Sequence, residues 1–207
     1  MENDVTYLKE QMTEEIAHGI CVSGLASRVA RELGLSEEKR YELAVAGMLH
    51  DVGKLEVWKY IYQRENTLHI EEMRYVRSHP TLGYTMLVDA GYSQFILESI
   101  LYHHENFDGT GYPSNRGGEE VPIGARILRV CDVFAALIAD RPYRRAFSVD
   151  TAVELMIEEV KNFDMKIFLA FLTVVHQEET EDFLCSSRQS LQSHPDGEGQ
   201  EAEEEIL

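Results

Sequence analysis

Helical spacing of apolar residues is the feature that most constrains this chain, because strand-like alternation is hard to find along its length. A stretch from about 6 to 33 predicts one or two helices that end at Gly34, a residue type that favours helix ends. The letters SEEK at 36–39 are typical of a capped helix start. Further helices are expected over about 43–53, 70–89, 93–104, 123–139, 149–160 and 164–176. The sequence therefore predicts an all-α bundle with one long functional loop over 105–122.

Length and composition fit one well-buried domain, because the chain has 207 residues of which 44% are hydrophobic. No apolar run reaches the roughly 18 residues that a membrane span needs, and the amino terminus lacks the layout of a signal peptide. We therefore expect a soluble, cytoplasmic protein with no membrane partner. The three cysteines are widely spaced, which predicts neither a disulfide framework nor a thiolate zinc site.

The net charge of −18 argues against binding to a nucleic acid polymer, because phosphate contacts rely on lysine and arginine. Half of this charge lies in one stretch. Residues 177–207 contain ten acidic residues and one basic residue, Arg188, which gives a net charge of −9. That stretch is poor in large apolar residues. We expect a folded domain over 1–176 and a disordered acidic tail over 177–207.

The pair His50–Asp51 ends the most apolar predicted helix. A buried imidazole and carboxylate lose hydration energy, and a bound cation compensates that loss directly. Adjacent helical residues point about 100° apart, so the pair suits two neighbouring metal ions better than one. The alternative is a core histidine that bonds its neighbouring aspartate, and the pair alone favours neither.

Other histidines and acids stand in similar places. His103 and His104 end another apolar helix, and His79 precedes a proline at the start of a third. Asp132 follows the apolar run ARILRVC, while Glu14 stands four residues before His18 and so on the same helical face. Imidazole and carboxylate ligands without thiolates suit Fe, Mn, Ni or Zn, and the set is too large for a closed structural zinc site.

These residues resemble the framework of the HD phosphohydrolases, namely His18, the segment HDVGK at 50–54 and the distant Asp132. The segments HHENFDGTGYP at 103–113 and DRPYR at 140–144 are similar to the HD-GYP subfamily, whose members hydrolyse the bacterial second messenger cyclic di-GMP. The likeness covers about residues 10 to 175. It implies the helical bundle of an HD domain and a phosphodiesterase activity.

The resemblance also implies a polynuclear centre of two or three divalent transition metal ions. Fe or Mn is expected first, with Ni or Zn as alternatives. The ligand positions of the family fall on His50, Asp51, His79, His103, His104 and Asp132. Glu14 and His18 match the additional ligands of members that hold three ions.

The implied mechanism is hydrolysis by a metal-activated water, with Asp51 bridging two ions. Lys54 matches a lysine that binds substrate and supports the leaving oxygen, against the alternative of a solvated surface lysine. Arg141 and Arg144 match positions that hold phosphate or guanine. Tyr112 is expected to shape the pocket, although its Gly-Tyr-Pro loop also suits contacts with protein partners or a purely structural turn. A homodimer is compatible with the resemblance.

One departure concerns Ala135, which stands where the family often carries a second aspartate. It puts substrate preference in doubt more than hydrolysis. The favoured function is hydrolysis of cyclic di-GMP to the linear dinucleotide, GMP or both. The alternatives are an HD hydrolase for another cyclic or linear nucleotide and a catalytically weak module that senses cyclic di-GMP.

Overall fold

The computed structural model describes residues 2–62, 75–140 and 144–184, and across these ranges it contains helices and no strand. The prediction of an all-α fold is therefore confirmed. No helix in these ranges combines the length and hydropathy that a membrane span requires. The elements are α1 (Glu2–Glu32), α2 (Glu37–Leu49), α3 (Lys54–Tyr62), α5 (His79–Leu87), α6 (Gln94–Leu101), α7 (Ile123–Leu137), α8 (Val149–Glu158) and α9 (Met165–Val175), with short 3₁₀ turns at Gly118–Glu120 and Val160–Asn162.

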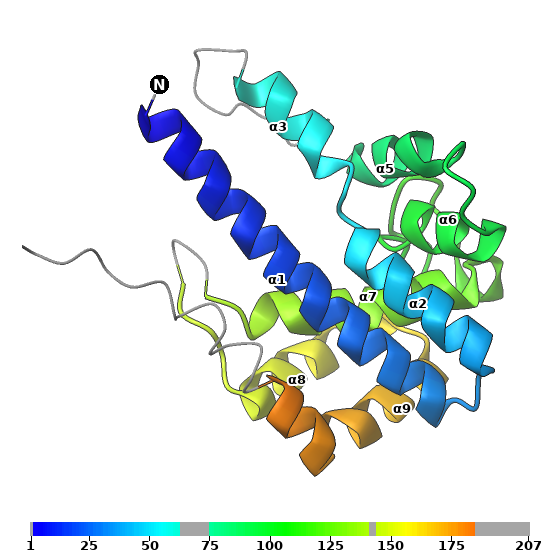
Figure 1. Ribbon diagram of the computed structural model, residues 1–207. Helices are drawn as coiled ribbons and strands as arrows, with labels where there is room; N and C mark the ends of the chain where they lie inside the picture. The colour runs from blue at the N-terminus through cyan, green and yellow to red at the C-terminus, as the bar shows by residue number, and fades with distance from the viewer. Residues whose placement is uncertain (1, 63–74, 141–143, 185–207) are drawn as a thin grey trace, which may run out of the picture.

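The long helix α1 organises the bundle. It runs diagonally through the molecule in Figure 1 and packs against α2, α7 and α9, while α5 and α6 pack against one another on the far side of α2. The sequence left open whether this stretch forms one helix or two, and the structure shows one. It ends as expected, because Gly34 adopts a left-handed φ of 74° that glycine tolerates without strain. Ser36 then caps α2 by accepting a hydrogen bond from the Lys39 amide at 3.3 Å.

Helix α3 was missed by the sequence prediction, which expected no helix directly after Gly53. Among its side chains that the structure describes, only Val57 is buried. The apolar periodicity that predicts a helix is therefore weak in this segment. Of the helix predicted over 70–89, residues 70–74 lie outside the described ranges. In the described part, residues 75–76 are helical, 77–78 form a turn and His79–Leu87 forms α5, so the predicted single helix is interrupted before His79.

The core lies where α1, α7 and α9 meet. Leu25 and Val29 of α1, Phe134 of α7 and Phe171 of α9 are all fully buried in one cluster. Each such side chain contributes about 1.5–3 kcal/mol when it leaves water. The resulting frame fixes the middle of α1 against α7, and those two helices carry His18 and Asp132.

The domain extends beyond the predicted boundary at residue 176. Residues 178–184 are helical, Thr180 is buried, and Leu184 is buried within the core cluster. The Arg28 guanidinium lies 4.4 Å from the centre of the Phe183 ring. The boundary was placed too early because these apolar contacts are embedded in an acidic run. Residues 185–207, the remainder of the predicted disordered tail, lie outside the described residues.

We expect truncation to separate these two parts of the carboxyl terminus. A chain that ends at His176 loses the buried Leu184 and the packed Phe183, worth about 3 kcal/mol together. Its melting temperature should fall by roughly 6–12 °C for a domain of this size. A chain that ends at Leu184 should melt as the full chain does, because the sequence beyond it is poor in large apolar residues. Circular dichroism during heating measures both, and equal melting temperatures for the two truncations would contradict the revised boundary.

Candidate metal centre

Seven of the eight predicted metal ligands come together at one buried point. They are delivered by three helices, α1, α5 and α7, and by the residues directly after α2 and α6. Most of them are buried, including His50, His79 and His103 at 2% exposure or less. The seven are His18, His50, Asp51, His79, His103, His104 and Asp132.

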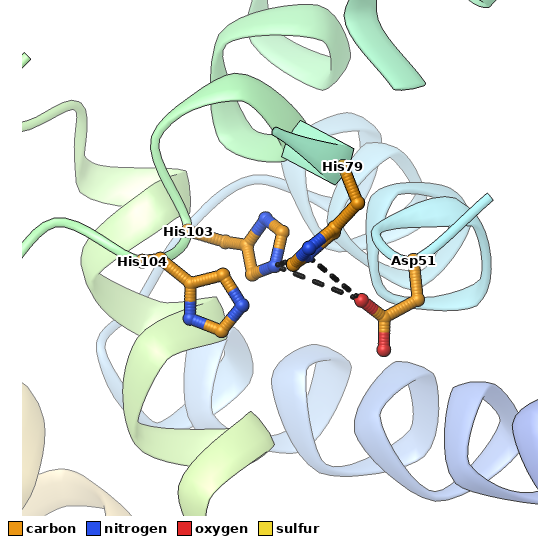
Figure 2. Close-up of side chains that lie close together, drawn as sticks. All are labelled: Asp51, His79, His103 and His104. Carbon is orange, nitrogen blue, oxygen red and sulfur yellow. Dashed lines mark hydrogen bonds and ion pairs between the residues drawn. The ribbon is translucent and has the colours of Figure 1, made fainter. Parts of the chain in front are cut away.

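Their ligand atoms form two groups, and within each group every pair of atoms lies within 4.8 Å. The first group, shown in Figure 2, consists of Asp51, His79, His103 and His104, with the three imidazoles facing the carboxylate. The second group consists of His18, His50 and Asp132. The described residues thus offer two adjacent sites rather than one.

Asp51 lies between the two groups. Its Oδ1 is 3.0 Å from His79 Nε2 in the first group, and its Oδ2 is 3.1 Å from His50 Nε2 in the second. Each carboxylate oxygen therefore faces a different set of imidazoles. Asp132 reaches across in a similar way, with Oδ1 at 2.9 Å from His18 Nε2 and Oδ2 at 4.0 Å from His104 Nδ1.

Backbone carbonyls orient three of the histidine rings. The Nδ1 atoms of His50, His79 and His103 lie 2.8, 2.8 and 2.6 Å from the carbonyl oxygens three residues earlier in the chain. A carbonyl oxygen only accepts, so each Nδ1 carries the proton and donates. In the neutral ring this leaves an Nε2 lone pair that points into the cluster, the arrangement that histidine ligands of metals commonly show.

The groups fit divalent cations because several polar atoms are otherwise left without compensation. The Nε2 atoms of His79 and His103 face one another at 3.3 Å, which sets two lone pairs opposed when both rings are neutral. His50 Nε2 and Asp51 Oδ1 are buried and lack a hydrogen bond. Buried polar atoms of this kind are destabilising unless a partner or an ion satisfies them.

Burial and neighbouring charge set the protonation of the rings. Burial lowers the pKa of His104 to about 3 and holds the pKa of His103 well below its ordinary value, so both are neutral at pH 7. Burial also acts to lower the pKa of His50, but the carboxylates of Asp51 and Asp132 outweigh it and raise the pKa to about 10. Two buried carboxylates thus attract positive charge to this point, as a metal site requires.

Lys54 lies at the edge of the cluster. Its Nζ donates to Asp51 Oδ2 at 2.7 Å and to Glu15 Oε1 at 3.2 Å. Burial acts to lower the pKa of Lys54, but these two carboxylates outweigh it and raise the pKa, so the side chain remains an ammonium. Sequence reasoning missed Glu15, although its place three residues before His18 puts both on one face of α1. Glu14 is exposed and belongs to neither group.

The Gly-Tyr-Pro loop covers His104. The Tyr112 ring stacks on the His104 ring with centroids 4.7 Å apart, and the Tyr112 amide donates to the His104 carbonyl at 3.2 Å. A Cβ on Gly111 would lie 2.3 Å from the Asn106 nitrogen, so only glycine permits this fold-back. Burial raises the pKa of Tyr112, and among nearby charges Arg129 and Arg77 oppose the rise. The phenol therefore stays neutral, with the Arg77 guanidinium carbon 5.6 Å from the centre of its ring.

Of the two arginines predicted to bind substrate, the structure describes only Arg144. Arg144 donates to the carbonyl oxygens of Ala136 and Leu137, both at 3.0 Å, and its guanidinium lies 4.3 Å from the centre of the Phe147 ring. It thereby satisfies carbonyls at the end of α7, and its role in substrate binding stays a prediction. Arg141 lies outside the described residues. Ala135 is buried in the core.

Gly53 permits the close approach of α5 to the residues that follow Asp51. A Cβ on Gly53 would lie 2.0 Å from the His79 carbonyl oxygen and 2.5 Å from the Gly83 nitrogen. We expect Gly53→Ala to displace His79, weaken metal binding and lower the free energy of unfolding by about 1–3 kcal/mol. Gly83→Ala is the matched control, because its Cβ would meet its nearest atom at an ordinary 3.4 Å. Metal titration and chemical unfolding of both variants test the expectation, and equal behaviour would contradict it.

Comparison with known proteins gives a consistent result. Residues 3–167 match the HD domain family. A cyclic di-GMP phosphodiesterase of Pseudomonas aeruginosa is 37% identical over 159 residues, which is 76% of this chain and 38% of the relative. A 3′3′-cGAMP-specific phosphodiesterase of Vibrio cholerae is 35% identical over 143 residues, 69% of this chain and 31% of the relative. The chain spans well under half the length of these two relatives.

A solved structure agrees with the fold. The crystal structure of a cyclic GMP-AMP-specific phosphodiesterase of Vibrio cholerae superposes with a TM-score of 0.66. The alignment covers 86% of this chain and 49% of that one, at 18% sequence identity. At this identity the likeness concerns the arrangement of the helices alone.

Proposed function

This chain belongs to the HD domain family, and we propose that it is a metal-dependent phosphodiesterase that hydrolyses cyclic di-GMP. The observation that carries the proposal is the position of Asp51, whose two oxygens face two separate groups of imidazole and carboxylate ligands. Such a bridged pair of sites suits phosphodiester hydrolysis, in which two ions act on the attacking and leaving oxygens. The names of relatives from Pseudomonas aeruginosa and Vibrio cholerae support a cyclic dinucleotide as substrate.

The metal ions would be held by the two groups, with Fe or Mn as the first expectation and Ni or Zn as alternatives for these nitrogen and oxygen ligands. When bound, they would polarise the phosphate and lower the pKa of a water towards neutrality. The residues of the chain do the rest. Asp51 holds the two sites at a fixed separation, and Lys54 presents its ammonium beside Asp51, where it would stabilise charge on the leaving oxygen. Tyr112 covers the imidazole of His104 and forms one wall of the site.

Product analysis tests the proposal. Protein purified without oxygen and loaded with Mn²⁺ or Fe²⁺ should convert cyclic di-GMP to the linear dinucleotide, GMP or both, as chromatography would show. A preference for 3′3′-cGAMP is the second candidate, because one relative carries that specificity in its name. Binding of cyclic di-GMP without any turnover would instead favour the sensor module. Cytoplasmic location, homodimerisation and contacts of the Gly-Tyr-Pro loop with protein partners remain predictions from the sequence.

The number of ions is a separate question, which Glu14→Gln addresses. We propose two ions, because the described ligand atoms form two groups and Glu14 is exposed outside both. Metal analysis of the wild type and of Glu14→Gln should therefore give the same value of two per chain. Three ions in the wild type and two in the variant would instead support the third site that the sequence resemblance implies.

A further inference from the structure

Two arginines that the sequence motifs did not single out lie close to the loop that covers His104, Arg77 beside Tyr112 and Arg129 beside Asn106. The guanidinium carbon of Arg77, two residues before His79, lies 5.6 Å from the centre of the Tyr112 ring. That ring in turn stacks on His104. Arg77 is exposed, so its guanidinium is open to solvent at the edge of the metal centre.

Arg129 approaches the same place from α7. It stands three residues before Asp132 and therefore on the same helical face. Its Nε donates to Asn106 Oδ1 at 3.0 Å, and the Asn106 amide is itself fixed by donating to Thr110 Oγ1 at 3.0 Å. This bond orients the Arg129 guanidinium through Nε, and only one of its five N–H groups is needed for it.

Neither guanidinium is neutralised by an acid within the described ranges. No carboxylate oxygen of the residues that the structure describes lies within 4.0 Å of the Arg77 or Arg129 nitrogens, although the whole chain carries a net charge of −18. Arg126, one turn earlier on α7, shows the contrast because it is paired with Asp164. Among the acids that the structure describes, none pairs with these two cations at the rim of a site for an anionic substrate.

We propose that Arg77 and Arg129 bind the second phosphate of the cyclic dinucleotide while the first lies at the metal centre. The inference rests on the proposed function. A cyclic dinucleotide carries two phosphodiesters, and only the one to be cleaved would lie at the metal centre. Guanidinium groups suit the other, because each can donate two parallel hydrogen bonds to phosphate oxygens.

The test compares two substrates that differ in the number of phosphates. Cyclic di-GMP has two, whereas bis(4-nitrophenyl) phosphate has a single phosphodiester. Each of Arg77→Gln and Arg129→Gln should raise KM for cyclic di-GMP by about tenfold or more, with kcat little changed, since a lost bond to a charged group is worth that much. The kcat/KM for bis(4-nitrophenyl) phosphate should fall by about twofold at most. Arg129→Lys should raise KM for cyclic di-GMP less than Arg129→Gln does, because lysine keeps the positive charge but cannot donate two parallel hydrogen bonds.

Arg31→Gln is the control for loss of one positive charge, because Arg31 is paired with Glu179 at the far end of α1. Arg31→Gln should leave KM and kcat unchanged for both cyclic di-GMP and bis(4-nitrophenyl) phosphate. Ionic strength gives a second readout, since added salt should raise KM of the wild type more steeply than KM of the Arg77→Gln, Arg129→Gln double variant.

The outcomes separate this inference from the proposed function. If the wild type cleaves bis(4-nitrophenyl) phosphate but no cyclic dinucleotide, the proposed function fails before any variant is compared. If the wild type cleaves cyclic di-GMP and both variants retain its KM, the inference alone is overturned. Equal losses on both substrates would overturn it as well, because they would show a general effect on the metal centre.

Discussion

Asp51→Asn should lose metal from both groups and lose hydrolysis with it. Each oxygen of Asp51 faces a different set of imidazoles, so one substitution reduces the negative charge of both sites while it keeps the size of the side chain. Turnover should fall by at least about 10²–10³-fold, the loss typical when one electrostatic group of a catalytic site is removed. Metal analysis and product chromatography on the same preparation measure the two effects.

Thermal unfolding adds a readout that does not depend on activity. Metal at about 100 times its dissociation constant stabilises a folded protein by roughly 2.7 kcal/mol. For a domain of this size that corresponds to roughly 5–11 °C in melting temperature. The wild type should show this gain on addition of Mn²⁺, and Asp51→Asn should lose most of it. Asp89→Asn is the matched control at an exposed position just beyond α5. Full metal content in Asp51→Asn would contradict the bridging role.

Much of the fold could be predicted because its signals are local. The capping serine before α2 and the left-handed Gly34 after α1 act within a few residues, and both were visible in the sequence. Helix α3 was not, because few of its described side chains are buried, and the helical residues 178–184 were not, because they pack against segments far away in the chain. Leu184, for example, is buried against the core although acids surround it in the sequence.

In the candidate site, too, some features could be predicted from the sequence and others could not. Histidines at the ends of apolar helices predicted a shared centre, because a buried imidazole needs compensation wherever its helix ends. Sequence spacing could not show that Asp51 directs its two oxygens to different groups, or that Arg144 is engaged at the end of α7. Nor could it show that Arg129 lies beside Asn106, since 23 positions separate them in the chain. These features depend on how helices cross, which local patterns do not encode.

Lys54→Met should reduce turnover strongly while the metal stays bound. The Lys54 ammonium donates to Asp51 Oδ2 at 2.7 Å and is also held by Glu15. Because those carboxylates raise the pKa of Lys54, it carries its charge throughout the neutral range and can stabilise negative charge on the leaving oxygen. Removing that charge should lower kcat by about 10²–10³-fold. Metal affinity should be kept or slightly raised, because a positive charge beside the cations is gone.

The comparison of Lys54→Met with Lys59→Met separates catalysis from surface charge. Lys59 also lies on α3, but it is exposed and pairs with Glu56, so its loss should leave both kcat and metal content unchanged. Unchanged turnover in Lys54→Met would show that Lys54 is a structural partner of Asp51 and Glu15 alone. Loss of metal from Lys54→Met would point to the same conclusion by another route, since the ammonium would then serve to hold the Asp51 carboxylate between the two groups. Only a fall in kcat with metal retained assigns the ammonium to the reaction itself, and metal analysis before each assay decides among these results.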